Sequence, residues 1–292
     1  MRMILTGLVC IFSLFVMGCS EVTPTSTEQM GIDLNLSENE VAYTYFDLTS
    51  GEATLIQSGK DGNVLIGTGE KSSEQELAKR LKMFHVDTID SLVIINNQPE
   101  YIGNLEWILN HFTVRNIFVP SEIEKEITKR FMLENGVVVG WSNGDKQEIL
   151  PGLFTEVLYA GEHGAFETGF VLSFMYGDQR TLYMGVADEE MERNLIEDFY
   201  LKSAILKVAE FGSPLGTSKA FLEEVDPQVA ILFQKEGSLP SETVLERLQE
   251  TWIDIYQTNK NGTVTIKFTE SDYEILTVHL DEQQKRFSLW KK

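Results

Sequence analysis

The sequence has few cysteines, few histidines and few basic residues for its length. Of 292 residues only two are cysteines, Cys10 and Cys19, and only four are histidines. Lysine and arginine together number 24 against 45 aspartates and glutamates, which gives a formal net charge of −21. Because so acidic a chain repels phosphate backbones, non-specific binding to nucleic acid is not expected. Beyond the first 18 residues the chain also lacks a hydrophobic run long enough to span a membrane, so no transmembrane helix is predicted.

The first 18 residues have the pattern of an export signal. Arg2 is followed by an apolar run from Ile4 to Val16, which is too short for a stable transmembrane helix but typical of a signal peptide. The run ends at Gly18-Cys19, which resembles a bacterial lipobox. We therefore expect residues 1–18 to be a lipoprotein signal peptide, and Cys19 to carry the lipid (palmitate among its acyl chains) that anchors the protein to the extracytoplasmic face of the cell membrane. The alternative is an ordinary secretory signal with an incidental cysteine.

This interpretation leaves the mature chain without a disulfide, since Cys10 is removed and Cys19 is lipidated. The residues up to 40 are rich in Ser, Thr, Glu and Asn and show no sustained apolar period. Such a segment cannot bury enough apolar surface to order itself. We therefore expect residues 19–40 to form the lipidated N-terminus and a flexible tether, and residues 41–292 to form one domain with a well-buried core.

From Val41 onward, strand and helix patterns alternate. Runs of β-branched and aromatic residues at Val41–Leu48 and Ala53–Gln57 predict a hairpin, and the nearly continuous apolar run Ile89–Ile95 predicts a strand buried on both faces. Later strands are expected at Val114–Val119, Val137–Trp141, Leu153–Tyr159, Phe170–Tyr176, Thr181–Gly185, Ala204–Ala209, Val229–Phe233, Ile253–Gln257, Thr263–Phe268 and Tyr273–Leu280. The alternation predicts an α/β fold in which helices cover two packed sheets.

Several short strings carry a resemblance to a known family. Residues 45–56 read YFDLTSGEATLI, close to FLDVGQGDATLI, and residues 64–69 read VLIGTG, close to VLIDTG. IDSLVII at 89–95, YIGN at 101–104 and LKVAEFGS at 206–213 follow in the order of that family's later motifs. The chain thus resembles the metallo-β-lactamase superfamily, and in particular the extracytoplasmic hydrolase-like domain of ComEC-type competence proteins. The resemblance implies a four-layer αββα sandwich, with two mixed sheets packed face to face and helices outside.

The resemblance also implies where metal ligands would lie. The family's loop His-x-His-x-Asp-His, its bridging aspartate and a later His-His pair correspond here to Asn96, Gln98, Glu100, Tyr101, Val186, Glu210 and Phe211. Amide oxygens are poor zinc ligands, and valine and phenylalanine cannot bind a metal at all. We therefore expect no metal, no other cofactor and no catalytic residue. Glu100 and Glu210 are at most a weak calcium or magnesium site.

The leading hypothesis is a non-catalytic pseudoenzyme, in which these seven positions form a pocket that acts as a binding or interaction module. Its partner would be a small polar ligand such as a sugar, or an envelope protein. The alternative is a divergent metal-dependent hydrolase, phosphodiesterase-like, nuclease-like or lactamase-like, with a possible link to DNA uptake. Other catalytic patterns, such as a G-x-S-x-G elbow, a P-loop or a dinucleotide-binding glycine motif, do not occur in the sequence.

Overall fold

The computed structural model describes residues 31–134, 136–163 and 167–279. The predicted signal peptide, Cys19 and the tether up to residue 30 lie outside the described residues, so export and lipidation remain predictions. Within the described ranges, no helix is both long enough and apolar enough to cross a membrane.

In the described part of the chain, the strands form two mixed sheets, one of eight strands and one of seven. The strands of the first sheet are, in spatial order, β15 (Tyr273–Val278), β14 (Thr263–Phe268), β1 (Val41–Tyr45), β2 (Thr54–Ser58), β3 (Asn63–Ile66), β4 (Thr88–Val93), β5 (Thr113–Pro120) and β6 (Val138–Trp141). Pairing is antiparallel from β15 to β3 and parallel from β3 to β6.

The second sheet follows the same plan. Its strands are, in spatial order, β13 (Asp254–Gln257), β12 (Val229–Leu232), β11 (Ile205–Lys207), β10 (Gln179–Met184), β9 (Glu167–Tyr176), β8 (Leu153–His163) and β7 (Lys146–Leu150). Pairing is parallel from β13 to β10 and antiparallel from β10 to β7. Each sheet therefore has a set of parallel strands whose carboxyl ends share one edge, which is where α/β proteins place ligand sites.

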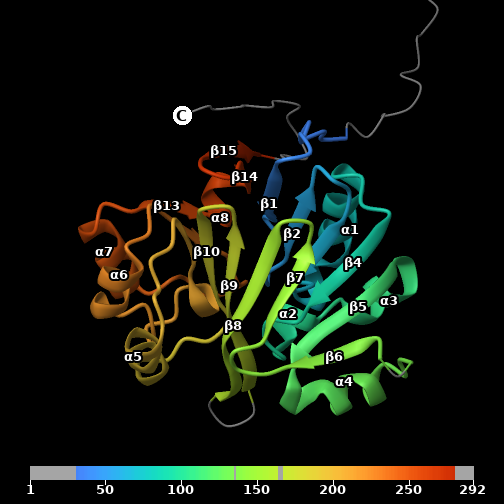
Figure 1. The fold of residues 1–292 in the computed structure, drawn as a ribbon, viewed down its shortest axis with the longest axis horizontal. Coiled ribbons are helices and arrows are strands. Elements are labelled where there is room, and N and C mark those ends of the chain that lie inside the picture. Colours follow the sequence, from blue (N-terminus) through green and yellow to red (C-terminus); the bar gives the residue numbers. More distant parts are fainter. Residues whose placement is uncertain (1–30, 135, 164–166, 280–292) are drawn as a thin grey trace, which may run out of the picture. The chain divides into compact units, whose positions relative to one another are not determined.

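Helices cover the outer face of each sheet (Figure 1). The first sheet is covered by α1 (Glu74–Met83), α3 (Leu105–His111) and α4 (Glu124–Arg130), and the second by α5 (Glu189–Asp198), α6 (Lys219–Val225) and α7 (Glu242–Glu250). The short helices α2 (Pro99–Ile102) and α8 (Thr258–Asn261) and the 3-10 turns η1 (Lys71–Ser73), η2 (Ser121–Ile123) and η3 (Ala209–Phe211) occupy connections. The expected four-layer αββα sandwich is confirmed.

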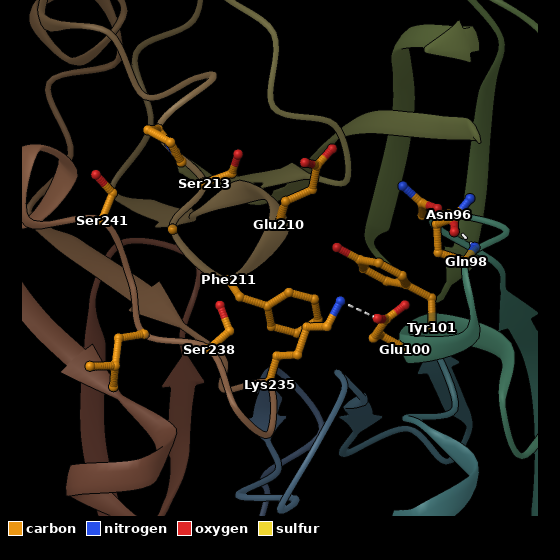
Figure 2. A pocket seen from close by; sticks show the side chains of 13 residues that line it. Asn96, Gln98, Glu100, Tyr101, Glu210, Phe211, Ser213, Lys235, Ser238 and Ser241 are labelled. Carbon is orange, nitrogen blue, oxygen red and sulfur yellow. Dashed lines mark hydrogen bonds and ion pairs between the residues drawn. The ribbon is translucent and has the colours of Figure 1, made fainter. Parts of the chain in front are cut away.

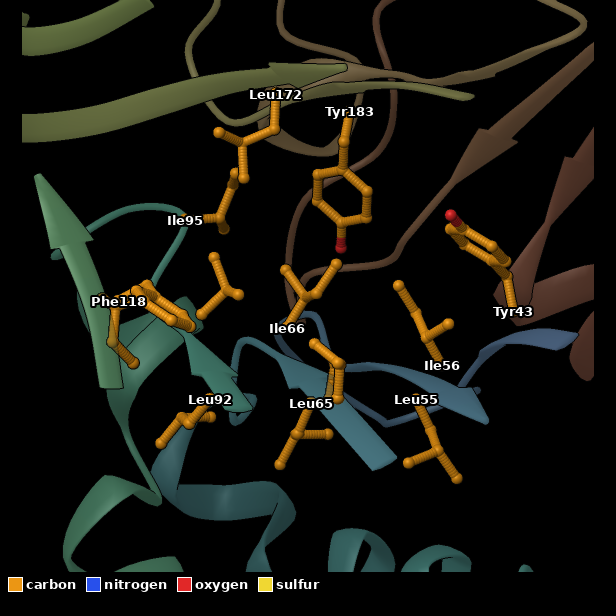
Figure 3. Packing of buried hydrophobic residues seen from close by; sticks show 14 of the residues in the cluster. Tyr43, Leu55, Ile56, Leu65, Ile66, Leu92, Ile95, Phe118, Leu172 and Tyr183 are labelled. Carbon is orange, nitrogen blue, oxygen red and sulfur yellow. The ribbon is translucent and has the colours of Figure 1, made fainter. Parts of the chain in front are cut away.

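The central strands are apolar on both faces because both faces are covered. Figure 3 shows Leu55, Leu65 and Leu92 pointing toward the helices, and Ile56 and Ile66 pointing toward the second sheet. All five side chains are fully buried. Burial of one such side chain stabilises the fold by about 1.5–3 kcal/mol, so these strands supply much of the folding free energy.

Aromatic and polar contacts join the two sheets. The rings of Tyr43 and Phe174 meet edge to face with centroids 6.1 Å apart. The hydroxyl oxygens of Thr54 and Tyr183 lie 3.0 Å apart and share a hydrogen bond. These contacts fix the position of one sheet on the other.

The connection between β1 and β2 reaches across to the second sheet. Gly51 in this connection has a φ of +90°, and a Cβ atom there would lie 2.3 Å from the backbone nitrogen of Glu70. The Gly51 N–H donates a hydrogen bond of 3.1 Å to the carbonyl of Gln234, in the loop after β12. Only glycine adopts this φ without strain and leaves room for so close an approach.

Two details of the sequence-based prediction are wrong. Residues 31–40, assigned to the flexible tether, lie on the domain: the Ile32 N–H donates to the Met83 carbonyl at 2.7 Å, and Ile32 and Leu34 pack against the core. Residues of this segment therefore pack on the domain that was expected to begin at Val41. Strand β7 was also missed, because its sequence KQEIL has three exposed polar residues and lies at a sheet edge.

Candidate functional site

A pocket of about 560 Å³ lies where the loops after β4, β11 and β12 meet (Figure 2). These three strands belong to the parallel halves of the two sheets, and the loops leave their carboxyl ends. The pocket is lined by Asn96, Gln98, Glu100, Tyr101, Glu210, Phe211, Gly212, Ser213, Pro214, Lys235, Ser238, Leu239 and Ser241.

The loop after β4 is held by the side chain of Asn96. This residue is 1% exposed, its amide nitrogen donates a 3.0 Å hydrogen bond to the Gly185 carbonyl, and its amide oxygen accepts a 2.9 Å bond from the Gln98 N–H. The first bond crosses from the first sheet to the end of β10 in the second. Asn96 therefore has a structural role in addition to its place in the pocket wall.

Glu100 is anchored at both its backbone and its side chain. Its carbonyl accepts a 3.0 Å hydrogen bond from the Glu52 N–H, and its carboxylate forms an ion pair with the ammonium of Lys235. The Glu100 side chain is 15% exposed and that of Lys235 is 42% exposed. The pair closes one wall of the pocket and neutralises the Glu100 charge (Figure 2).

The turn after β11 is strained. Glu210 and Phe211 have φ values of +42° and +58°, which non-glycine residues rarely adopt. One oxygen of the Glu210 carboxylate accepts a 3.0 Å hydrogen bond from the Ala187 N–H, and the Gly212 N–H donates to the Ala209 carbonyl at 2.9 Å. Strain of this kind costs about 1–3 kcal/mol per residue and is common at ligand sites. Here the strained turn places the Phe211 ring in the pocket wall (Figure 2).

Tyr101 and Phe211 form an aromatic pair whose ring centroids are 5.6 Å apart at an interplanar angle of 42°. Tyr101 is 2% exposed, and its hydroxyl has no hydrogen-bond partner among the described residues. In Figure 2 the hydroxyl points toward the middle of the pocket, between Glu210 and Phe211. Burial, followed by the nearby carboxylates of Glu52 and Glu210, raises the pKa of Tyr101 well above its ordinary value. The phenol is therefore a neutral hydrogen-bonding group at physiological pH.

A buried ion pair lies behind Tyr101. Lys207 and Glu52 are both 0% exposed, and the lysine nitrogen is 2.6 Å from a carboxylate oxygen of Glu52. The same nitrogen donates a 2.7 Å hydrogen bond to the Met184 carbonyl and lies 4.6 Å from the Tyr183 ring centroid and 5.8 Å from that of Tyr101. Burial raises the pKa of Glu52 to about 7, although Lys207 opposes the shift, and burial lowers the pKa of Lys207.

Known structures share this arrangement of sheets and helices. The metallo-β-lactamase fold protein YhfI from Bacillus subtilis aligns with 75% of this chain and 96% of its own, at a TM-score of 0.54 and 12% identity. Zinc-bound PqqB from Methylobacterium extorquens aligns with 71% of this chain and 85% of its own, at a TM-score of 0.53 and 10% identity. The chain has the metallo-β-lactamase fold. At such low identity the likeness shows the fold alone.

A sequence relative confirms the resemblance to competence proteins. ComE operon protein 3 from Bacillus subtilis strain 168 is 24% identical over 298 aligned residues, which cover 91% of this chain but 36% of that protein. The chain thus corresponds to about a third of the length of this relative. No family profile matches the sequence.

The residues of this metallo-β-lactamase fold do not fit the metal ions that the superfamily binds. At the ligand positions, Asn96 is committed to backbone hydrogen bonds, the Glu100 carboxylate is paired with Lys235, and Phe211 offers only a ring. Among the described residues no three His, Cys, Asp or Glu side chains come close enough together to hold a metal ion. Zinc sites in proteins are built from three or four such side chains.

The structure brings together six of the seven predicted positions: Asn96, Gln98, Glu100, Tyr101, Glu210 and Phe211. Val186 is the exception, because it is fully buried in the core on the outer face of the second sheet and does not line the pocket. Sequence reasoning missed Lys235, Ser238 and Ser241, and it did not assign Ser213 or Leu239 to the pocket. It also missed the pair of Lys207 and Glu52, although a lysine inside the apolar run 204–209 signals a buried charge that needs a partner.

Proposed function

We propose that this domain is a non-catalytic binding module, which binds a small polar ligand in the pocket at the carboxyl ends of β4, β11 and β12. The observation that carries the proposal is the pocket itself. It has the volume of a small-molecule site, about 560 Å³, and its wall combines aromatic rings with hydroxyl and amide groups. Such a lining orients a ligand through hydrogen bonds while excluding water from its apolar parts.

The pocket offers little for hydrolysis. Hydrolysis needs a group that activates water and a group that stabilises the developing negative charge. No histidine is among the described residues that line the pocket. The ammonium group of Lys235, which lines the pocket, is already paired with the Glu100 carboxylate. The side chains are thus arranged to hold one another and a ligand rather than to activate a water molecule.

The proposal includes attachment to the outer face of the membrane through lipid on Cys19. Its support is the apolar segment ending in Gly18-Cys19. The acidic composition argues against direct binding of DNA, and a contact with an envelope protein is compatible with the same anchored position.

A ligand screen that compares the wild type with a variant whose pocket is filled tests the binding function. The domain comprising residues 31–292 would be screened by thermal shift against a library of neutral, cationic and anionic metabolites. Ser238→Trp fills the pocket from its exposed rim, whereas Ser271→Trp makes the same change at an exposed residue away from the pocket. At least one compound should stabilise the wild type and Ser271→Trp but not Ser238→Trp. If no compound does so, the proposed binding function is wrong.

Metal analysis tests the non-catalytic part of the proposal. After dialysis against trace zinc and manganese, the purified domain should retain far less than one equivalent of either metal. One equivalent that is lost in a Glu100→Ala variant would overturn the proposal in favour of a metal-dependent hydrolase.

A further inference from the structure

The Tyr101 hydroxyl carries information about the chemistry of the ligand. It is buried, lacks a partner among the described residues and points toward the middle of the pocket (Figure 2). A buried hydroxyl without a hydrogen bond costs about 1–3 kcal/mol. A ligand that supplies a hydrogen-bond acceptor at this point recovers that free energy, so the pocket favours ligands that carry one there.

The charges around the hydroxyl disfavour an anion. Glu52, Glu100 and Glu210 all lie near enough to Tyr101 to raise its pKa. The two lysines of this region are each paired with one of these carboxylates, Lys207 with Glu52 and Lys235 with Glu100. With three carboxylates against two lysines, the charge around the Tyr101 hydroxyl is negative on balance, which disfavours a phosphate or carboxylate at the centre of the pocket.

The same hydroxyl disfavours an ammonium group. An ammonium has donors only, so it would leave the phenol proton of Tyr101 without an acceptor. A neutral hydroxyl both donates and accepts, so it can accept the phenol proton of Tyr101 and still donate to another group of the pocket wall. The negative charge disfavours an anion and the hydrogen-bonding requirement of the phenol disfavours an ammonium, which leaves an uncharged, hydroxylated group.

The remaining wall is suited to a sugar ring. Phe211 presents an aromatic ring beside Tyr101, and an aromatic ring packs well against the apolar C–H face of a pyranose. Ser213, Ser238 and Ser241 add hydroxyl groups to the pocket wall, with Ser238 beside Phe211 (Figure 2). Leu239, which is 84% exposed, adds an apolar edge at the rim.

We infer that the ligand is an uncharged saccharide, whose ring packs on Phe211 and which accepts a hydrogen bond from the Tyr101 hydroxyl. This inference rests on the proposed binding function and names its ligand class. Tyr101 thereby determines specificity by its phenol, and the paired lysines keep the pocket from accepting phosphorylated sugars.

Titration calorimetry with probes that share one ring tests the inference. The probes are glucose, N-acetylglucosamine, cationic glucosamine and anionic N-acetylglucosamine 6-phosphate. We expect at least one neutral sugar to bind ten or more times tighter than either charged probe. Tyr101→Phe should weaken that binding about threefold to tenfold, as loss of one hydrogen bond predicts, and Phe211→Ala should weaken it more than tenfold.

Tyr45→Phe is the matched control. Tyr45 is also fully buried and its hydroxyl also has no hydrogen-bond partner among the described residues, but it does not line the pocket. This variant should bind the neutral sugar like the wild type, and circular dichroism checks that each variant is folded. Equal affinity of Tyr101→Phe and the wild type, or tighter binding of a charged probe, overturns the inference.

The two proposals can fail separately. If no sugar binds but the thermal-shift screen finds a ligand that Ser238→Trp excludes, the ligand class is wrong and the binding function stands. If neither experiment finds a ligand, the binding function itself is wrong.

Discussion

Replacing Lys207 by methionine removes the ammonium of the buried ion pair behind the pocket while keeping a side chain of similar size. In the wild type the lysine nitrogen lies 2.6 Å from a Glu52 oxygen, and both side chains are fully buried. The variant leaves the Glu52 carboxylate in the core without its cation. Removal of one partner of a buried pair typically costs about 3–5 kcal/mol of unfolding free energy, and we expect a loss of that size at pH 8.

The loss should depend on pH in a defined direction. The pKa of Glu52 is raised from 4.5 to about 7 in the folded protein, so the folded state holds a proton more tightly than the unfolded chain between these values. This carboxyl therefore favours the folded state most at low pH, and its contribution is lost as pH rises through 7. Because Lys207 opposes the shift, its removal raises the pKa of Glu52 further. At pH 5.5 the carboxyl is mostly neutral in both proteins, so the loss should be smaller than at pH 8 by about 1.4 kcal/mol, which corresponds to the one pH unit between the wild-type pKa of about 7 and pH 8.

Urea unfolding followed by tryptophan fluorescence at pH 5.5 and pH 8 measures both values. Lys202→Met is the matched control, because Lys202 pairs with Asp226 at the surface, with side chains 59% and 67% exposed. Exposed pairs contribute little because solvent and salt screen them, so this variant should change little at either pH. The double variant Glu52→Gln with Lys207→Met should recover much of the lost free energy, since it leaves no buried charge.

An equal loss at both pH values would refute this reasoning, since the destabilisation would then come from packing rather than charge. A loss below about 1 kcal/mol at pH 8 would show that Glu52 finds another partner or water once the lysine is gone. Additive losses in the double variant would show that the two side chains do not interact.

Two further substitutions test other parts of the structure by the same unfolding assay. Asn96→Ala removes the hydrogen bond to the Gly185 carbonyl and leaves the Gln98 N–H without its side-chain acceptor. The variant should therefore lose about 2–4 kcal/mol of unfolding free energy. A loss below about 1 kcal/mol would contradict the structural role of this amide. Trp252 is 95% exposed and has a φ of +60° at the end of α7. Trp252→Gly should therefore be about 0.5–1 kcal/mol more stable than Trp252→Ala, because glycine relieves the left-handed strain, and equal stability would show that the strain is absent.

Much of the fold could be predicted because its central strands have apolar sequences that are recognisable without the structure. Ile89–Ile95 is apolar except for Asp90 and Ser91, and the structure covers β4 on both faces. Strand β7 gave no such signal, since an edge strand with three exposed polar residues has the composition of a loop. The segment 31–36 was missed for a similar reason. Its alternate residues Ile32 and Leu34 are only half-buried and stand among polar neighbours.

The site was predictable where its residues follow motif-bearing strands and not elsewhere. The loop after β4 and the turn after β11 could be located from the strings that precede them, and both line the pocket. Val186 was misplaced because alignment gives a position in the chain, but the direction of a side chain at a strand end depends on the local backbone. Lys235 belongs to a loop without a motif, and its pairing with Glu100 arises only when the two sheets pack together.

The two lysine–carboxylate pairs link the stability of the domain to the chemistry of its pocket. In each pair the carboxylate lies on the first-sheet side, in a connection after β1 or β4, and the lysine lies in β11 or in the loop after β12 of the second sheet. The pairs therefore hold the two halves of the site together. They also neutralise both lysines of this region and two of the three carboxylates near Tyr101, which are charges that would otherwise attract a phosphate or a metal ion. A site tied together in this way recognises a ligand through neutral hydrogen-bonding groups and aromatic rings beside the Glu210 carboxylate, and this lining is the reason why we infer an uncharged polar ligand rather than a metal ion or a phosphate.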